Sequence, residues 1–348
     1  MSISVTLKRN AIEEPLKLNA EGCDNAIGSA KTADGRVFPA QKCGNDVVIL
    51  ADGARNEALE LELSADSCGA GVKIVEAPQR NALDIYIGGD LFTSYVYSGQ
   101  LKPYLGPILA KNGDWITRLD LETKEHPHQR SVFVAVGDVN GIDFWNENSH
   151  PGEERHQGFD QIVSGNAFGT FTARNVWLSE TGVPQLDEKR TYTFYAQSPA
   201  CRYVDLAVTF TATYGDVVFG PTKEAGPLGI RINESMRADR GGHFCNAYGA
   251  ENEAEAWGRP APWCDYRGEV NGNAYGIAAF DNEDNERYPT TWHIRNYGLF
   301  AANSLYFKGG LTIRAGESLT YKIRLCFYEG EIDTAARFQL YAKDSCGK

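Results

Sequence analysis

The sequence predicts an all-β protein: a large, mainly antiparallel β-sandwich of the supersandwich type with a short C-terminal helix. Three observations support this prediction. Apolar and polar residues alternate with a period of two over most of the chain, long amphipathic helical stretches are missing, and the 36 glycines suit many tight turns. Many strands without intervening helices favour a sandwich or a barrel. Roughly twenty strands are too many for an immunoglobulin-type module, so we expect a large two-sheet sandwich.

The strand segments are rich in Val, Ile, Thr, Tyr and Phe, and Gly, Asn or Asp clusters bound them. A helix is expected only near the end, where IDTAARFQLYAKD (332–344) has an Asp near its start and apolar residues at helical spacing. The clearest strand segments are 59–64, 72–77, 83–89, 92–99, 170–179, 190–197, 204–214 and 319–330.

Three parts are predicted along the chain. Residues 1–88 contain several short strands and predict an N-terminal β subdomain. Residues 89–330 contain the densest mixture of aromatic and polar side chains and predict the main sandwich with the functional site. Residues 331–348 predict the C-terminal helix and tail.

Composition and charge exclude several function classes. The net charge is −12, from 34 basic and 46 acidic residues, and no Lys/Arg cluster that could neutralise phosphates occurs, so nucleic acid is not an expected partner. No apolar run approaches the roughly 18 residues that cross a bilayer. The start MSISVTLKRN lacks the features of a secretion signal. A cytoplasmic protein without a membrane partner is therefore expected.

Eight cysteines are scattered along the chain without a C-x-x-C pair, so a structural zinc site is not indicated. For a cytoplasmic protein, disulfides are not expected either. Most cysteines are therefore predicted to be buried thiols, with Cys326 in an apolar strand as the clearest example.

The stretch EHPHQRSVFVAV (125–136) places His126 and His128 two positions apart, just before an apolar strand. In an extended chain, residues i and i+2 point to the same face, and Pro127 favours extended geometry for the residue before it. We therefore expect two imidazoles side by side at the strand end. They could be two ligands of a divalent metal, completed by a third His or a carboxylate. They could instead be an acid or base that works near neutral pH, or a polar strand end that bonds neighbouring loops.

Three further segments combine aromatic and polar side chains: NSHPGEERHQG (148–158), AWGRPAPWCDYRG (256–268) and TTWHIRNYGLFAAN (290–303). In the last, alternation predicts His293, Arg295 and Tyr297 on one face. Sugar C–H faces stack on aromatic rings, while sugar hydroxyls need fixed donors and acceptors. A carbohydrate ligand is therefore expected. Phosphate-loop, dinucleotide and nucleophile-elbow motifs are missing, which argues against nucleotide and serine-hydrolase chemistry.

Several segments between 92 and 303 resemble the bacterial proteins of unknown function that are labelled "methane oxygenase PmoA-like". They include FTSYVYSGQLKPYLGPI (92–108), HPHQRSVFVAVGDVNGIDFWNE (126–147) and WGRPAPWCDYRG (257–268). A true particulate methane oxygenase subunit is a membrane-embedded helical protein, so the resemblance does not imply that activity. It implies a role in sugar catabolism. The family pattern HPHHR has a histidine where this chain has Gln129, which weakens a metal site that needs a third histidine there.

The sequence thus predicts a carbohydrate-processing enzyme, a lyase or hydrolase that acts on a keto-sugar or a glycoside. The expected chemistry is proton abstraction α to a carbonyl, followed by loss of a glycosidic oxygen. His126 or His128 is the expected base, or together they hold a divalent metal that polarises the carbonyl. His293 or Tyr266 is the expected acid for the leaving group.

The substrate-binding residues are expected to contact hydroxyls or a developing enolate. Those predicted for this role are Arg130, Asp265, Arg295, Trp263, His156 and Asn140. A sugar mutarotase or epimerase, a non-catalytic glycan-binding module and a mononuclear metal oxygenase are the alternatives. A homo-oligomer is compatible with the sequence.

Overall fold

The computed structural model describes residues 2–23, 26–119, 125–148 and 150–342. The first part of the chain forms a six-stranded antiparallel sheet with the order β1-β6-β3-β4-β5-β2. Its apolar side chains form a core of their own. Its strands are β1 (Ser2–Thr6), β2 (Ala11–Asn19), β3 (Ser29–Thr32), β4 (Val37–Cys43), β5 (Asp46–Gly53) and β6 (Ala58–Ser64).

The rest of the chain builds a sandwich of two eight-stranded sheets. Sheet I has the order β21-β22-β17-β11-β10-β9-β8-β7, and its neighbouring strands are antiparallel. Its strands are β7 (Val72–Ala77), β8 (Ala82–Ile87), β9 (Asp90–Val96), β10 (Tyr104–Leu105), β11 (Val132–Val136), β17 (Ala225–Arg231), β21 (Trp292–Ile294) and β22 (Leu299–Ala302).

Sheet II has the order β12-β13-β14-β15-β24-β20-β19-β18, again with antiparallel neighbours. A two-stranded ribbon of β16 (Val217–Phe219) and β23 (Leu311–Ile313) accompanies the two sheets. The strands of sheet II are β12 (Glu153–Val163), β13 (Phe168–Leu178), β14 (Pro184–Tyr195), β15 (Arg202–Thr211), β18 (His243–Asn246), β19 (Trp263–Val270), β20 (Asn273–Asp281) and β24 (Ser318–Glu329).

The main hydrophobic core lies between sheets I and II, and strand alternation decides which side chains enter it. In β11, Val132, Val134 and Val136 belong to this core, whereas Phe133 and Ala135 belong to a smaller cluster. That smaller cluster lies on the side of sheet I that faces away from sheet II, called here the outer face. Because β11 is buried on both faces, the sequence SVFVAV is a continuous apolar run rather than an alternating one.

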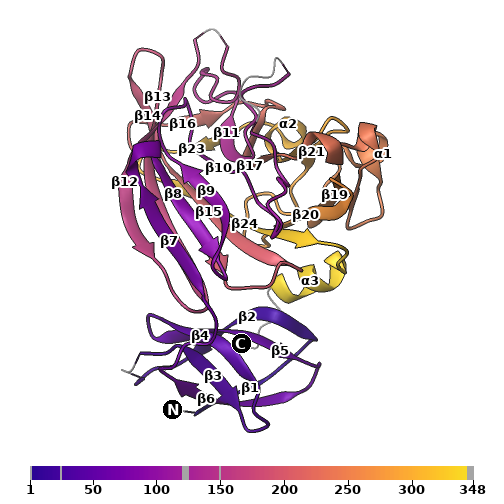
Figure 1. Ribbon diagram of the computed structural model, residues 1–348. Coiled ribbons are helices and arrows are strands. Elements are labelled where there is room, and N and C mark those ends of the chain that lie inside the picture. The colour runs from indigo at the N-terminus through magenta and orange to yellow at the C-terminus, as the bar shows by residue number, and fades with distance from the viewer. Residues whose placement is uncertain (1, 24–25, 120–124, 149, 343–348) are drawn as a thin grey trace.

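Helices are short. The expected C-terminal helix is α3, and the Asp333 side chain caps it by accepting a hydrogen bond from the Ala336 N–H at 2.9 Å. In Figure 1 this helix lies where the sandwich meets the N-terminal sheet, and Arg337 donates to the Ile12 carbonyl there at 2.6 Å. The helical elements are α1 (Asn252–Ala256), α2 (Leu305–Lys308), α3 (Thr334–Tyr341) and the 3₁₀ segments η1 (Pro78–Arg80), η2 (Glu234–Met236) and η3 (Ala238–Arg240).

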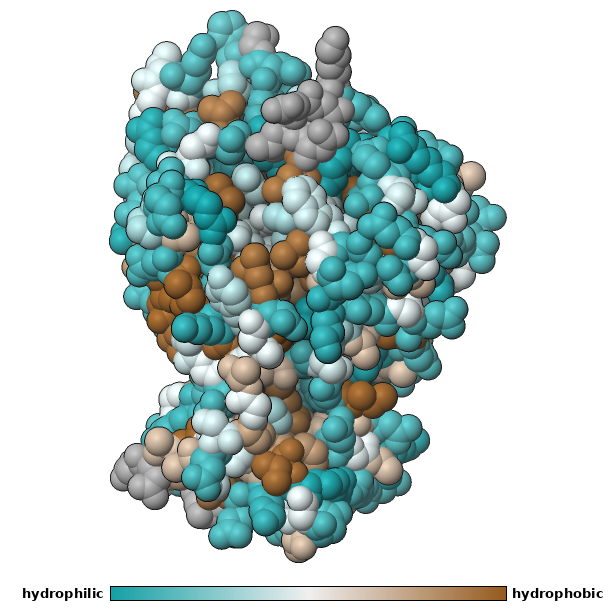
Figure 2. Space-filling view, viewed as in Figure 1, coloured by the Kyte–Doolittle hydropathy of each residue, from teal (hydrophilic) through white to brown (hydrophobic). Residues whose placement is uncertain are grey.

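The predicted fold class is confirmed: the protein is an all-β sandwich of antiparallel sheets with one short C-terminal helix. Figures 1 and 2 show the N-terminal sheet as a separate lobe, joined to the sandwich by a narrower waist. Strands β7 and β8 pair within sheet I, so the change from one sheet to the next falls between Ser64 and Val72 rather than after residue 88. The division into domains stays a prediction. No helix among the described residues is long and apolar enough to cross a membrane.

The cysteine prediction is wrong in two respects. Cys326 is buried as expected, but it forms a disulfide with Cys201, the residue just before the neighbouring strand β15. Among the free cysteines, Cys43 is exposed, and Cys68 is only partly buried. Disulfides are typical of oxidising compartments, and the cytoplasmic location stays a prediction. Cys346 lies outside the described residues.

Candidate functional site

A row of paired residues on the outer face of sheet I leads toward the predicted histidines. His293 in β21 pairs with Ala301, Ala301 pairs with Gly229, and Gly229 pairs with Phe133 in β11. Directly paired residues share a face of the sheet. Trp292, next to His293, enters the core between the sheets, so the row itself faces away from that core.

His126 lies near this row because its imidazole ring stacks on a residue of the β21–β22 turn. The ring is parallel to the phenol ring of Tyr297, with centroids 4.9 Å apart, and lies 5.8 Å from the ring of His128. The two histidines are therefore neighbours as expected. The expected reason is wrong, because His126 has a left-handed backbone with φ of 50° and the next two residues form a turn. A turn, not an extended strand, brings the imidazoles together.

His128 is buried beside a charged triplet. Glu147 accepts hydrogen bonds from both Arg130 and Lys102, with Lys102 Nζ at 3.0 Å and Arg130 Nη2 at 2.6 Å. Burial raises the pKa of Glu147, but the bonds from Arg130 and the charge of Lys102 outweigh burial and lower the pKa to about 2. Burial, with the charges of Lys102 and His126, lowers the pKa of His128 to about 4. His128 is therefore a neutral imidazole at pH 7.

A second charged cluster supports the other side of His126. Arg118 donates to the backbone carbonyl of His126 at 3.0 Å and pairs with Glu234 at 2.6 Å. Arg231 pairs with the same carboxylate at 3.2 Å and lies 4.9 Å from the ring centroid of Tyr297. Burial and the charge of Arg231 lower the pKa of His126. Together they outweigh the charge of Glu125, which acts to raise that pKa. His126 is thus held near guanidinium groups as a neutral base.

The other end of the site is aromatic. His293 is 3% exposed, and burial, together with the charges of Arg295 and Lys223, lowers its pKa to about 4. Its ring lies 6.2 Å from that of Trp257. Trp257 in turn contacts two exposed rings of α2, Tyr306 and Phe307, at 6.3 and 5.0 Å.

These contacts form one continuous series on the molecule, called here the histidine–aromatic row. From one end it consists of Phe307, Tyr306, Trp257, His293, Arg295, Tyr297, His126 and His128. Arg295 lies 5.5 Å from the ring centroid of Tyr297 and links the two ends. Arg295 and Tyr297 thus lie together as expected, but strand alternation is not the reason, because β21 ends at Ile294 and Tyr297 lies in the following turn.

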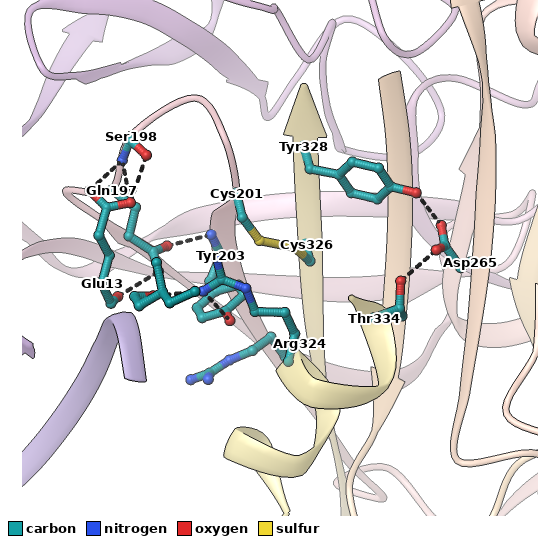
Figure 3. The surroundings of a disulfide bond; sticks show 12 residues. Glu13, Gln197, Ser198, Cys201, Tyr203, Asp265, Arg324, Cys326, Tyr328 and Thr334 are labelled. Carbon is teal, nitrogen blue, oxygen red and sulfur yellow. Dashed lines mark hydrogen bonds between the residues drawn. A yellow bond between two sulfur atoms is a disulfide. The ribbon is translucent and has the colours of Figure 1, made fainter. Parts of the chain in front are cut away.

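Two predicted site residues lie on the far side of sheet II instead. Asp265 is 1% exposed and accepts hydrogen bonds from Tyr328 at 2.6 Å and from Thr334 of α3 at 2.5 Å, as Figure 3 shows. Trp263 packs in the same cluster as Tyr328. Asp265 thus links α3 to sheet II through hydrogen bonds. The positions of Asp265 and Trp263 do not support the predicted substrate-binding role of either residue.

Tyr266 points the opposite way from Asp265 and enters the core between the sheets. Its hydroxyl oxygen accepts from the Ala238 N–H at 2.8 Å and donates to the carbonyls of Arg295 and Asn296, at 3.3 and 3.2 Å. Tyr266 therefore supports the β21–β22 turn from behind. Because its hydroxyl is fully engaged inside the core, it is not placed to act as an acid in the histidine–aromatic row.

His156 and Asn140 lie in other places. His156 in β12 packs on Tyr97 and Phe159, with ring centroids 4.8 and 4.5 Å away, and bonds Asn175 at 3.3 Å. Asn140 is a turn residue with φ of 54° whose side-chain oxygen accepts from the Val218 N–H at 2.8 Å. Neither is brought to His126 by a contact within the described residues.

The expected metal site has only two of its ligands. Within the ranges that the structure describes, no group of three or more His, Cys, Asp or Glu side chains is arranged to hold a metal ion. His126 and His128 lie close together, and the Glu125 carboxylate lies 3.8 Å from His126 Nδ1. Glu125 is paired with Arg231 and Arg237, however, and Glu147 is bound by Lys102 and Arg130. The described residues therefore do not fit the divalent metal predicted for this pair.

Sequence reasoning missed the charged groups that surround the histidines. Lys102 and Glu147 are separated by 45 positions and meet only through the pairing of sheet I. Arg231 ends β17 and is completely buried, although its charge predicts an exposed position. One signal was present: Glu147 ends the segment that begins with His126, so its carboxylate could have been considered with the histidines.

Comparisons with known proteins find similar solved structures at low identity. No curated protein matches the chain. One similar solved structure is the GH36 α-galactosidase AgaB from Geobacillus stearothermophilus, with 12% identity, a TM-score of 0.41, and coverage of 74% of this chain and 41% of that one. Another is the GalM/aldose epimerase homologue from C. elegans, with 10% identity, a TM-score of 0.31, and coverage of 72% and 96%. The chain thus spans about two fifths of the length of that galactosidase.

A family model matches three quarters of the chain. The match runs from residue 82 to residue 342, which includes every residue of the histidine–aromatic row. It begins at β8 and leaves out the six-stranded N-terminal sheet. The chain belongs to the family described as "Family of unknown function (DUF6807)".

Proposed function

We propose that this protein is a carbohydrate-processing enzyme whose active site is the histidine–aromatic row. The observation that carries the proposal is the stacking of His126 on the ring of Tyr297, with the ring of His128 next to His126 and the guanidinium of Arg231 over the Tyr297 ring. The substrate class that suits this site is a keto-sugar or a glycoside derived from one. The reaction class is elimination, which begins with removal of a proton α to a carbonyl.

His126 is the base in this proposal. Its side chain is 38% exposed, so a substrate can reach it, whereas His128 is almost fully buried. A lowered pKa keeps the His126 imidazole neutral at pH 7, and a neutral imidazole can accept a proton. The proton moves from the substrate carbon to His126, and the electron pair of the C–H bond moves toward the carbonyl oxygen as an enolate forms.

The arginines near Tyr297 suit the negative charge of that enolate. Arg295 is partly buried and lies 5.5 Å from the ring centroid of Tyr297, and a fixed cation at the place where charge develops stabilises a transition state. The fully buried Arg231 lies 4.9 Å from the same centroid and adds positive charge without contacting a substrate. Collapse of the enolate then breaks the bond to the glycosidic oxygen. The imidazolium of His126 returns its proton to that oxygen, so the step is balanced without an external oxidant or reductant.

The aromatic end of the row suits the sugar ring. Tyr306 and Phe307 are exposed, Trp257 is half-buried between them and His293, and such rings stack on the C–H faces of sugars. The resemblance to proteins associated with sugar catabolism supports the same class of ligand. A role in binding is thus proposed for Trp257, Tyr306 and Phe307.

The test is a screen of purified protein against native glycosides and the matching 3-keto glycosides. Elimination is followed by the ultraviolet absorbance of the conjugated product, and epimerisation by NMR, since it conserves mass. His126→Ala is expected to lower the elimination rate about 10²- to 10⁴-fold. His150→Ala is the matched control, because the His150 side chain is 79% exposed and pairs with Glu180 at the surface. Equal rates for His126→Ala and the wild type would overturn the assignment of His126.

A further inference from the structure

A hollow of about 270 Å³ lies where the sandwich meets the N-terminal sheet, far along the chain from the histidines. Its wall combines the segment that enters β7, the β8–β9 turn and the loop that precedes β15. Two cationic side chains, Arg202 and Lys111, and one carboxylate, Asp90, line it together with Ser198 and Gln197. None of these residues has a role in the proposed carbohydrate site, so the inference below is independent of the proposed function.

Arg202 is the unusual member of this wall. It is the first residue of β15 and is only 5% exposed. Its neighbour Tyr203 packs on the far side of sheet II, so alternation turns Arg202 toward the space between the sheets. There its guanidinium lies 5.3 Å from the ring centroid of Phe92. The side chain thus closes the end of the main core at the hollow.

The guanidinium of Arg202 lacks an ionic partner in the part of the chain that the structure describes. Its Nε is buried without a hydrogen-bond partner, and no described carboxylate lies within ion-pair distance. Buried charges in proteins are normally paired and hydrogen-bonded, because desolvation of an isolated ion is costly. Two other buried arginines follow that rule, because Arg190 binds both Glu154 and Glu188, and Arg324 binds Glu14 and Asp205.

Two of the three carboxylates around Arg202, Glu13 and Glu329, bind other groups, whereas the third, Asp90, lines the hollow itself. Glu13 accepts hydrogen bonds from the backbone and the hydroxyl of Ser198, at 3.0 and 2.7 Å, as Figure 3 shows. Glu329 accepts from the Lys111 N–H at 2.7 Å. Burial lowers the pKa of Arg202 although Glu329, Asp90 and Glu13 act in the opposite direction. The nearby negative charges therefore do not compensate for the desolvation of this guanidinium.

We propose that this hollow binds the carboxylate or phosphate group of a small anionic molecule, with Arg202 as the principal ligand and Lys111 as the second cation. A guanidinium presents a planar fork of N–H donors that matches both oxyanions. The volume of about 270 Å³ is below the roughly 300–1,000 Å³ of pockets that hold drug-sized ligands. The ligand is therefore a small acid or a small phosphate ester, held between the sandwich and the N-terminal sheet.

Isothermal titration calorimetry of the full chain tests this site. The probes are inorganic phosphate and glucuronate, each titrated at an ionic strength held constant with sodium chloride. At least one probe is expected to bind saturably with a stoichiometry of one, and which probe binds decides between phosphate and carboxylate. Arg202→Met is expected to weaken that binding at least tenfold. Arg55→Met is the matched control, because Arg55 is exposed in the turn between β5 and β6 and does not line the hollow.

Thermal unfolding without added anion separates this site from a structural role of Arg202. Arg202→Met removes an unpaired buried charge, so it is expected to unfold at the same temperature as the wild type or a higher one. Arg202→Lys keeps the charge without the fork and is expected to bind less tightly than the wild type, which keeps the test available if the Met variant does not fold. No saturable binding of either probe to the wild type, or equal affinity in the wild type and the Arg202 variants, would overturn the proposal.

Discussion

The imidazole ring of His126 and the phenol ring of Tyr297 lie parallel, with an interplanar angle of 0° and centroids 4.9 Å apart. This contact joins two loops that are far apart in the sequence: the segment before β11 and the β21–β22 turn. Tyr266 bonds the carbonyls of that turn from the core side, and Arg118 bonds the backbone carbonyl of His126. The two rings are therefore held in place from the side of the protein interior, which orients the proposed base, His126, without a ligand.

The first prediction concerns this ring contact. Tyr297→Ala removes the ring that covers His126, so the imidazole gains contact with water and its pKa is expected to rise toward the ordinary value. Tyr297→Phe keeps the ring and is expected to leave the pKa close to that of the wild type. A histidine NMR titration of the three proteins measures this. Identical His126 pKa values in the Ala and Phe variants would contradict a stabilising contact.

The second prediction concerns stability below pH 6.5. His128 has a folded-state pKa of about 4, below its unfolded value of about 6.5. Between these values the unfolded chain binds a proton that the folded protein does not, so the stability falls as the pH falls from about 6.5 to about 4. His128→Gln keeps a neutral polar side chain that does not titrate. Relative to the wild type, its free energy of unfolding is therefore expected to be up to about 2 kcal/mol higher at pH 4.5 than at pH 7.5.

Urea unfolding of the wild type and His128→Gln at both pH values measures this change. His150→Gln serves as the control, since His150 is an exposed residue paired with Glu180. The assignment fails if the difference in stability between wild type and His128→Gln is the same at the two pH values.

The third prediction separates the role of Asp265 from that of the proposed active site. Asp265→Ala leaves the hydroxyls of Tyr328 and Thr334 buried without their acceptor, and each lost buried bond costs about 1–3 kcal/mol. The variant is expected to lose stability and the docking of α3, with unchanged KM and kcat in the elimination assay at a temperature where it is folded. Tyr328→Phe removes one of the two bonds and is expected to have about half the effect. If Asp265→Ala lost activity while its stability stayed that of the wild type, a substrate-binding role for Asp265 would be supported instead.

The fold was largely predictable, whereas the composition of the site was only partly predictable. Strand alternation is a local property, and segments such as VKIVEA (72–77) correspond to a strand residue for residue. Sheet partners are not local: alternation in WCDY (263–266) separates Asp265 from Tyr266, but only the pairing of sheets shows that one faces α3 and the other faces the core. Lys102 and Glu147 meet for the same non-local reason.

His126 shows a different limit of sequence reasoning. The rule that the residue before a proline is extended gave the correct neighbour for the wrong reason, since the backbone at His126 is left-handed with φ of 50°. Bonds from Arg118 to the carbonyls of Glu125 and His126, at 2.9 and 3.0 Å, hold this conformation. Local propensity was overridden by contacts with a residue that the motif does not contain.

The last prediction concerns the junction of the N-terminal sheet and the sandwich. Glu14 of β2 is 1% exposed and binds Arg324 of β24 at 3.1 Å. Burial raises the pKa of Glu14 to about 7, although the charges of Arg324 and Arg337 act against it. The folded protein therefore keeps this proton up to about pH 7, whereas the unfolded chain loses it near pH 4.5, so this group contributes less stability as the pH rises from 4.5 through 7.

Glu14→Gln imitates the protonated carboxyl and avoids this loss. We expect the variant to match the wild type near pH 5 and to be more stable by about 1–2 kcal/mol at pH 8.5, as measured by urea unfolding. Glu62→Gln is the control, because this substitution removes the same charge from an exposed position of β6. If Glu14→Gln were instead less stable than the wild type at pH 8.5, the ionised carboxylate would be the form that joins the two parts, and its ion pair with Arg324 would outweigh the cost of its burial.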